Sequence, residues 1–193
     1  MKLTANHPIQ CRCGQVRGEL RAGAKFTRAV CYCHDCQAYA GALGDPGRVL
    51  DANGGTDIVA SLQQYVRFSK GSERLVCLSL SPRGMLRWYA SCCKTPIANT
   101  ARDPKLSYMG IVSSCLGRDA RSLDAVFGPP TVTYNAESAT GEVPPDGWRT
   151  PAATLRIMSR VLRARLDGSW RETSFFDPAG RPVAKPRVLS ARM

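Results

Sequence analysis

The stretch that decides the fold is a run of three cysteines within six residues, Cys31-Tyr32-Cys33-His34-Asp35-Cys36. Two further cysteine clusters lie on either side of it, Cys11-Arg12-Cys13-Gly14 and Cys92-Cys93-Lys94-Thr95-Pro96. Together the three clusters hold seven of the nine cysteines in the chain. Thiolates are soft ligands suited to zinc, which asks for little beyond roughly tetrahedral packing. The clustering therefore predicts that the chain is organised around bound Zn²⁺.

The two outer clusters predict one structural metal site. A tight turn that bears two cysteines can present both sulfurs to a metal ~2.3 Å away. Cys11 and Cys13 have this spacing, and Gly14 is free to adopt the positive φ that such a turn often needs. A two-cysteine turn supplies half of a closed site, and the available candidates for the other half are Cys92 and Cys93. Such a site would tie the N-terminal segment to a strand end about eighty residues later.

The middle cluster offers three sulfurs, those of Cys31, Cys33 and Cys36, from one short segment. This is the number expected of an open site with a vacant fourth position, where a substrate thiol could bind as thiolate or a carbonyl could be polarised. In that case the three cysteines are the candidate catalytic residues. The alternative is a second closed site, with His34 or another residue as the fourth ligand, and the spacing leaves both open. His34 and Asp35 are candidate proton carriers or partners of the ligands, or else solvated loop residues.

Composition sets the class of protein and its compartment. At 193 residues, with 44% hydrophobic and 22% charged residues, the chain is expected to form a soluble globular domain. Neither a signal peptide nor a run of ~20 apolar residues is found, so we expect a cytoplasmic protein with no membrane partner. In a reducing cytoplasm, closely spaced cysteines indicate metal binding or catalysis rather than disulfides.

The pattern of apolar residues predicts a mainly β fold. Turn residues are frequent (13 prolines and 17 glycines), and they separate short runs of β-formers. Strands are expected at 16–22, 25–30, 62–68, 75–80, 85–89 and 109–112, and one or two helical turns at 37–43. Cys77 and Cys115 sit in or beside these apolar runs without a thiol partner, so we expect both to be buried as small hydrophobes.

The C-terminal third predicts one amphipathic helix. We expect a zinc-binding domain at 1–128, followed at 129–193 by a connection, a basic helix and a tail packed on it. The helix is expected to begin near Pro151 and to have its arginines solvated. It is expected to dock on the core an apolar stripe made of Leu155, Met158, Val161, Leu162 and Leu166. The net charge is +12, and residues 149–193 contribute ten cations against three anions, or +7. This balance favours an anionic partner, or serves only solubility.

The order of these motifs resembles the glutathione-dependent formaldehyde-activating enzyme family, also called the centromere protein V family. The resemblance covers about residues 9–115 and is carried by Cys11-Arg12-Cys13-Gly14-Gln15-Val16, by the middle cluster with Gly41, and by the segment from Tyr89 to Pro96. It implies an Mss4-like fold of β-sheets stapled by zinc. It also implies a structural zinc at Cys11, Cys13 and Cys93 and a catalytic zinc at Cys31, Cys33 and Cys36. The implied activity is that of a carbon–sulfur lyase that joins formaldehyde to glutathione, a small anionic thiol.

The sequence departs from the family pattern at defined positions. The third family motif is typically Phe-Cys-x-x-Cys-Gly, whereas here Ala90 replaces the first cysteine and Lys94 the glycine. Cys92 is the candidate substitute for the fourth ligand, and the alternatives are a rearranged, three-coordinate or empty site. In the middle motif Tyr32 and His34 also differ from the usual residues. An alternative function is a non-enzymatic zinc module whose basic C-terminal part binds nucleic acid or an acidic protein. A third is a zinc-stabilised scaffold that has lost catalysis and binds a protein partner.

Overall fold

The computed structural model describes residues 1–117, 120–144 and 147–189. This part of the chain is mainly β, as predicted, and it includes a C-terminal helix. The strands are β1 (His7–Gln10), β2 (Arg17–Leu20), β3 (Thr27–Cys31), β4 (Thr56–Leu62), β5 (Val66–Lys70), β6 (Leu75–Ser79), β7 (Leu86–Ala90), β8 (Pro96–Thr100), β9 (Tyr108–Val112), β10 (Val132–Tyr134) and β11 (Arg187–Val188). The helices are α1 (His34–Leu43), α2 (Ala120–Phe127) and α3 (Arg149–Asp167).

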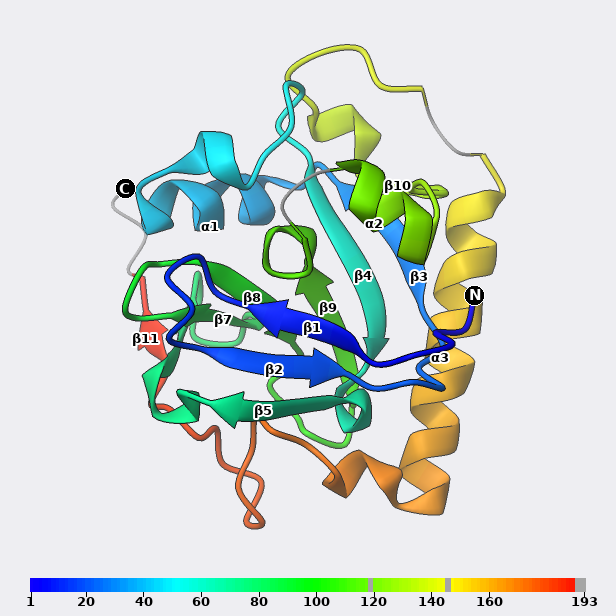
Figure 1. Cartoon of the computed structure of the whole chain (residues 1–193). Helices are drawn as coiled ribbons and strands as arrows, with labels where there is room; N and C mark the ends of the chain where they lie inside the picture. The colour runs from blue at the N-terminus through cyan, green and yellow to red at the C-terminus, as the bar shows by residue number, and fades with distance from the viewer. Residues whose placement is uncertain (118–119, 145–146, 190–193) are drawn as a thin grey trace.

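The strands form two sheets. The larger has the order β10-β3-β4-β9-β8-β7-β6-β11, and the smaller has the order β1-β2-β5. The larger sheet is antiparallel from β3 to β6, and its two edge strands run parallel to their neighbours. In Figure 1 the smaller sheet lies in front of the larger one, and α3 runs along one side of the molecule beside the N-terminus.

The main core lies between the two sheets. Its largest fully buried side chain is Trp88 on β7, whose ring packs 5.2 Å from that of Phe175. Phe26 packs edge-on against Phe127 on the α2 side of the same core. Residues 129–193 therefore contribute core side chains as well as strands β10 and β11. The predicted division of the chain at residue 128 remains a prediction.

The predicted docking face of the C-terminal helix is wrong. Of the five stripe residues only Val161 is buried, together with Ala153, Ile157 and Ala164, and these four form the docked face. Leu155, Met158, Leu162 and Leu166 are 73%, 49%, 57% and 79% exposed. The docked face packs on Ala60 and Leu62 of β4, and on Ala29 and Ile58 at its upper end. Alanine on both sides lets the helix approach the sheet closely, which a row of leucines would prevent.

Other boundaries also differ from those expected. The predicted strand at 62–68 is wrong in its first half, because Leu62 ends β4 and residues 63–65 form a 3-10 turn before β5. The helix expected at 37–43 begins three residues earlier, at His34, and ends where Gly44 takes a left-handed conformation. Cys77 and Cys115 are buried, as predicted. Within the described residues, no helix is long and apolar enough to cross a membrane.

Candidate metal centres

The first candidate centre is a group of four sulfurs from Cys11, Cys13, Cys92 and Cys93, which lie within 4.8 Å of one another. Neighbouring Sγ atoms are 3.3 Å apart for Cys13 and Cys92, 3.6 Å for Cys11 and Cys13, and 3.9 Å for Cys92 with either Cys11 or Cys93. Four sulfurs bonded tetrahedrally at ~2.3 Å would be ~3.8 Å apart. The group therefore fits a single metal ion with all four positions filled.

Two similar turns present these sulfurs. Cys11 follows β1, and the residue after the second cysteine, Gly14, has a φ of 71°. Cys92 and Cys93 follow β7, and the residue after them, Lys94, has a φ of 55°, although it is not a glycine. The N–H of Lys94 donates to the carbonyl of Ala90 over 2.8 Å and closes the second turn. A left-handed residue at the same place lets each short turn point two thiols at one spot.

Hydrogen bonds cross from one turn to the other. The backbone N–H of Arg12 donates to Oγ1 of Thr95 over 3.0 Å, and the Arg12 guanidinium donates to the carbonyl of Cys93 over 3.3 Å. The N–H of Val16 donates to Sγ of Cys11 over 3.2 Å. Burial opposes ionisation of Cys93, but hydrogen bonds from Thr95 and the Cys13 backbone lower its pKa to about 6. Burial raises the pKa of Cys11 and of Cys92, so the connected turns favour the thiolate form at Cys93.

The second candidate centre holds the sulfurs of Cys31, Cys33 and Cys36, which also lie within 4.8 Å of one another. Cys31 ends β3, Cys33 is the N-cap of α1, and Cys36 lies in the first turn of that helix. Cys31 and Cys36 are buried, whereas Cys33 is half-buried and leaves the group open to solvent on one side. Hydrogen bonds from the Cys31 and Cys36 thiols hold the pKa of Cys33 far below its usual range. Three ligands with one accessible side fit a metal ion with a vacant position.

A buried arginine lies behind the three sulfurs. The side chain of Arg87 on β7 is 4% exposed, and its guanidinium lies 3.8 Å from Sγ of Cys36 and 3.2 Å from the Asp35 carboxylate. Burial would lower the pKa of Arg87, but the Cys36 and Asp35 charges outweigh burial and raise it. A buried cation is stable only beside compensating negative charge. The position of Arg87 therefore favours an anionic thiolate group at this site.

Three further polar side chains lie near the sulfurs or beside Arg87. The Asn135 amide lies 3.6 Å from Sγ of Cys31. Burial, with the Tyr134 hydroxyl and the Cys31 and Cys36 thiols nearby, raises the pKa of Tyr108 on β9. Asn99, the cross-strand partner of Arg87, is 6% exposed, and its Oδ1 has no hydrogen-bond partner within the described residues. These residues form a polar wall on one face of the larger sheet.

The structure brings all seven predicted cysteines into the two predicted groups, and Cys92 supplies the fourth sulfur of the first. Asp35 contacts Arg87, whereas the His34 side chain is exposed and has no hydrogen bond in the described part of the chain. Sequence reasoning missed Arg87, Asn99, Tyr108 and Asn135. Two of them could have been found from the sequence, because Arg87 and Asn99 are each a large polar residue within a mostly apolar strand.

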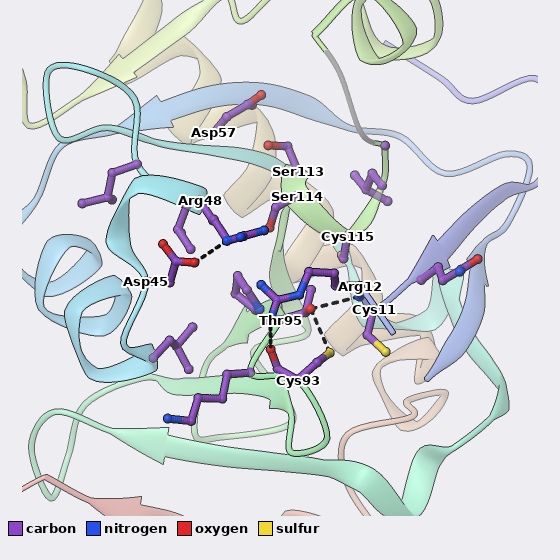
Figure 2. Close-up of a pocket in the computed structure, with 18 of the residues that line it drawn as sticks. Cys11, Arg12, Asp45, Arg48, Asp57, Cys93, Thr95, Ser113, Ser114 and Cys115 are labelled. Carbon is purple, nitrogen blue, oxygen red and sulfur yellow. Dashed lines mark hydrogen bonds and ion pairs between the residues drawn. The ribbon is translucent and has the colours of Figure 1, made fainter. Parts of the chain in front are cut away.

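A cavity of about 1170 Å³ opens beside the first group. Cys11 and Cys93 line it, and the Arg12 guanidinium points into it (Figure 2). Arg48 pairs with Asp45 and Arg28 with Asp57 along its wall, and Lys94 also lines it. Cys31, Cys33 and Cys36 do not line this cavity, so it is separate from the three-sulfur group.

The chain belongs to a family of unknown function (DUF6151), whose model matches residues 3–186. No curated protein matches the chain. A solved structure of a Rhodobacter sphaeroides protein is similar at 19% identity and a TM-score of 0.43, over 66% of this chain and 99% of that one. A TM-score this low does not establish a shared fold. The family description names no activity, so the resemblance to formaldehyde-activating enzymes stays a hypothesis.

Proposed function

We propose that this DUF6151 protein is a zinc-dependent enzyme of the carbon–sulfur lyase type that joins an aldehyde to a small anionic thiol. The observation that carries the proposal is the contrast between the two cysteine groups. Four sulfurs fill the first group, although two of them, Cys13 and Cys92, are exposed, whereas the second group has three sulfurs and so leaves one ligand position vacant beside the half-buried Cys33. A fold that needs one metal to join two distant turns has no structural need for an open group on a single segment. The open group is therefore the reaction site.

In this proposal zinc is held in both groups, since thiolate ligands at tetrahedral spacing suit it well. Cys11, Cys13, Cys92 and Cys93 would hold the structural ion. Cys31, Cys33 and Cys36 would hold the second. A zinc ion with a vacant ligand position would lower the pKa of a thiol bound there and would polarise the carbonyl of an aldehyde.

The residues of the polar wall have defined tasks. Arg87 compensates the negative charge of the three thiolates, and Asp35 holds the guanidinium in place. The Tyr108 hydroxyl, which lies near enough to Cys31 and Cys36 to interact with their charges, is our candidate hydrogen-bond donor to the oxygen of a bound aldehyde. These contacts position the reactants, which is the larger part of what a site must do for an addition of this kind.

The reaction adds the S–H bond of the thiol across the C=O bond of the aldehyde. A carbon–sulfur bond forms, the carbonyl π bond breaks, and the thiol proton ends on the former carbonyl oxygen, so no oxidant or further reactant is needed. With formaldehyde and glutathione the product is S-hydroxymethylglutathione. The net charge of +12 supports an anionic thiol but does not select glutathione among such thiols.

The test measures exchange between glutathione, formaldehyde and their adduct by two-dimensional exchange NMR, with the zinc content of each sample measured. The wild-type protein is expected to raise the exchange rate above the spontaneous rate, and Cys33→Ser to abolish the increase. Cys77→Ser is the matched control, because Cys77 is a buried thiol in β6, outside both groups. It should keep both the zinc and the rate.

Zinc-loaded protein that leaves the exchange rate unchanged with glutathione, cysteine and coenzyme A would exclude these thiols. If Cys33→Ser also changed no other measured property, the enzyme proposal would be wrong. The non-enzymatic zinc module would then be the better description.

A further inference from the structure

The outward face of α3 carries apolar side chains that nothing in the described chain covers. Leu155, Met158, Leu162 and Leu166 recur at spacings of three or four, so they lie along one side of the helix. Each is about half to four-fifths exposed. Trp148 precedes Leu155 by seven residues, which places it on the same line, and it is 76% exposed. We refer to these five residues as the outer stripe.

Arginines without partners accompany the outer stripe. The helix has five of them, Arg149, Arg156, Arg160, Arg163 and Arg165, against a single carboxylate, Asp167. Within the described residues none of the five forms an ion pair, and Nη1 of Arg160 is buried without a hydrogen-bond partner. At 100° per residue, four of them lie between the outer stripe and the docked face, on one flank.

The same flank gains further positive charge from the N-terminus. Burial and the nearby charges of Arg160 and Arg156 lower the pKa of the Met1 amino group, so the added charge on this flank comes from two lysines beside it. Lys2 and Lys25 are both exposed, and their backbones form an isolated antiparallel β-bridge next to Met1. Figure 1 shows the N-terminus beside α3 at one side of the molecule. The face therefore combines a row of apolar side chains with a row of unneutralised cations.

We propose that α3 binds the surface of an anionic lipid membrane, with the outer stripe among the acyl chains and the arginines on the headgroup phosphates. An amphipathic helix of this composition lies in the membrane interface and does not span it. The sequence alone predicted no membrane partner because no segment is long enough to cross a bilayer, and that criterion does not test surface binding. The proposal is independent of the proposed enzymatic activity.

Charge and shape favour this partner over three others. A second copy of α3 would bring the same five arginines against a single carboxylate. Nucleic acid would neutralise the arginines but leave the leucines against phosphates and water. An acidic helix of another protein could satisfy both rows, but binding it tightly requires anchoring pockets. A bilayer surface accepts a convex ridge of leucine, methionine and tryptophan without such pockets.

The test is cosedimentation of the full-length protein with vesicles of phosphatidylglycerol and phosphatidylcholine at a 1:1 ratio, and with vesicles of phosphatidylcholine alone. We expect binding to the mixed vesicles only, weakened by salt. The double variant Leu155→Gln/Leu162→Gln should bind at least about tenfold more weakly. Arg156→Gln/Arg163→Gln should bind roughly tenfold or more weakly, because each arginine near an anionic surface contributes to binding.

Two controls separate these effects from general loss of charge or apolar surface. Lys70→Gln/Arg83→Gln removes two exposed cations, one at the end of β5 and one in the turn between β6 and β7, and Leu106→Gln removes an exposed leucine from a loop. Both should bind like the wild-type protein. No binding to mixed vesicles at low salt would overturn the proposal.

Three other results would also overturn it. Binding that survives Leu155→Gln/Leu162→Gln would indicate electrostatic adsorption alone. A dimer in analytical ultracentrifugation that this variant abolishes, without vesicle binding, would assign the face to a second copy. Binding of duplex DNA or RNA that competes with vesicles and needs only the arginines would assign the face to nucleic acid.

Discussion

The two cysteine groups use the same ligand and are built in opposite ways. The four-sulfur group joins two turns about eighty residues apart, and its members range from buried to exposed. The three-sulfur group lies on one segment of six residues at the start of a helix. A site assembled from distant segments stabilises the fold, because the ion holds together chain that would otherwise separate. A site on one segment closes no long loop and is free to keep a vacant position.

The arginines beside the two cysteine groups also differ, in how far each is buried. Arg12 is exposed next to the four-sulfur group, where water can screen its charge. Arg87 is buried behind the three-sulfur group and depends on that group for compensation. Electrostatics at the first group are therefore adjustable from solvent, whereas at the second they are fixed by the fold.

The largest expected effect is the loss of the structural ion in Cys11→Ser. We expect the free energy of unfolding to fall by at least ~3 kcal/mol, a small part of the ~10–16 kcal/mol that structural zinc can supply. Thermal unfolding should shift down by about 6 °C or more. Cys33→Ser, measured in parallel, should lose one zinc but change stability by less than ~1 kcal/mol. Equal destabilisation by the two variants would remove the distinction between a structural and an open group.

The second effect concerns metal removal from the wild-type protein. EDTA should take one equivalent of zinc quickly, from the three-sulfur group, because a chelator can enter at its vacant ligand position, and the other slowly, because four sulfurs hold that ion and the two turns must separate to release it. A chromogenic zinc indicator follows both phases, and Cys33→Ser should lack the fast one. A single phase with two equivalents would mean that the two groups are equally protected.

The third effect is confined to the open group. Arg87→Met removes the buried charge but keeps an apolar side chain of similar length, so the fold should persist. Zinc affinity of the three-sulfur group should fall about 10–100-fold, as is usual when a partner of the ligands is lost. Competition with a zinc chelator measures this affinity, and Arg83→Met, at an exposed arginine, is the control. Unchanged affinity would show that Arg87 serves packing alone.

The sequence predicted the grouping of the cysteines better than it predicted the bounds of the elements. Spacing alone grouped the seven cysteines correctly, because a metal site needs several ligands and the chain offers few thiols outside the clusters. The polar residues behind the open group were not predictable in this way. Arg87 and Asp35 meet only because β7 and α1 pack together, and nothing in either segment indicates the other.

The error on α3 has a different origin. Leucine and methionine gave a regular apolar stripe, and such a stripe usually faces the core. The docking surface, however, includes Ala29 and Ala60, and the helix meets it with alanine and β-branched residues. Which of two apolar faces is buried depends on the shape of the sheet beneath, and that shape is absent from the helix sequence. The face with the leucines and the methionine, which the sequence predicted to be docked, is the one that is exposed.

The smallest effect tests the similarity of the two turns within the four-sulfur group. Lys94 and Gly14 take the same left-handed conformation, which costs a residue other than glycine about 1 kcal/mol. Lys94→Gly should therefore raise the free energy of unfolding by roughly 0.5–1 kcal/mol, and Gly14→Ala should lower it by about 1 kcal/mol. Thermal unfolding of the zinc-loaded protein should shift by about 2–4 °C in each direction.

Gly41→Ala is the control for the chemical change in Gly14→Ala. Gly41 lies inside α1 with an ordinary φ, and an added Cβ would meet nothing within 4 Å. Alanine there should stabilise the protein by about 0.5–1 kcal/mol, the opposite sign from the same change at Gly14. If Lys94→Gly instead destabilised the protein, the Lys94 ammonium near the C-terminal end of α1 would outweigh the backbone strain. The two turns would then share a shape but not the same cause of it.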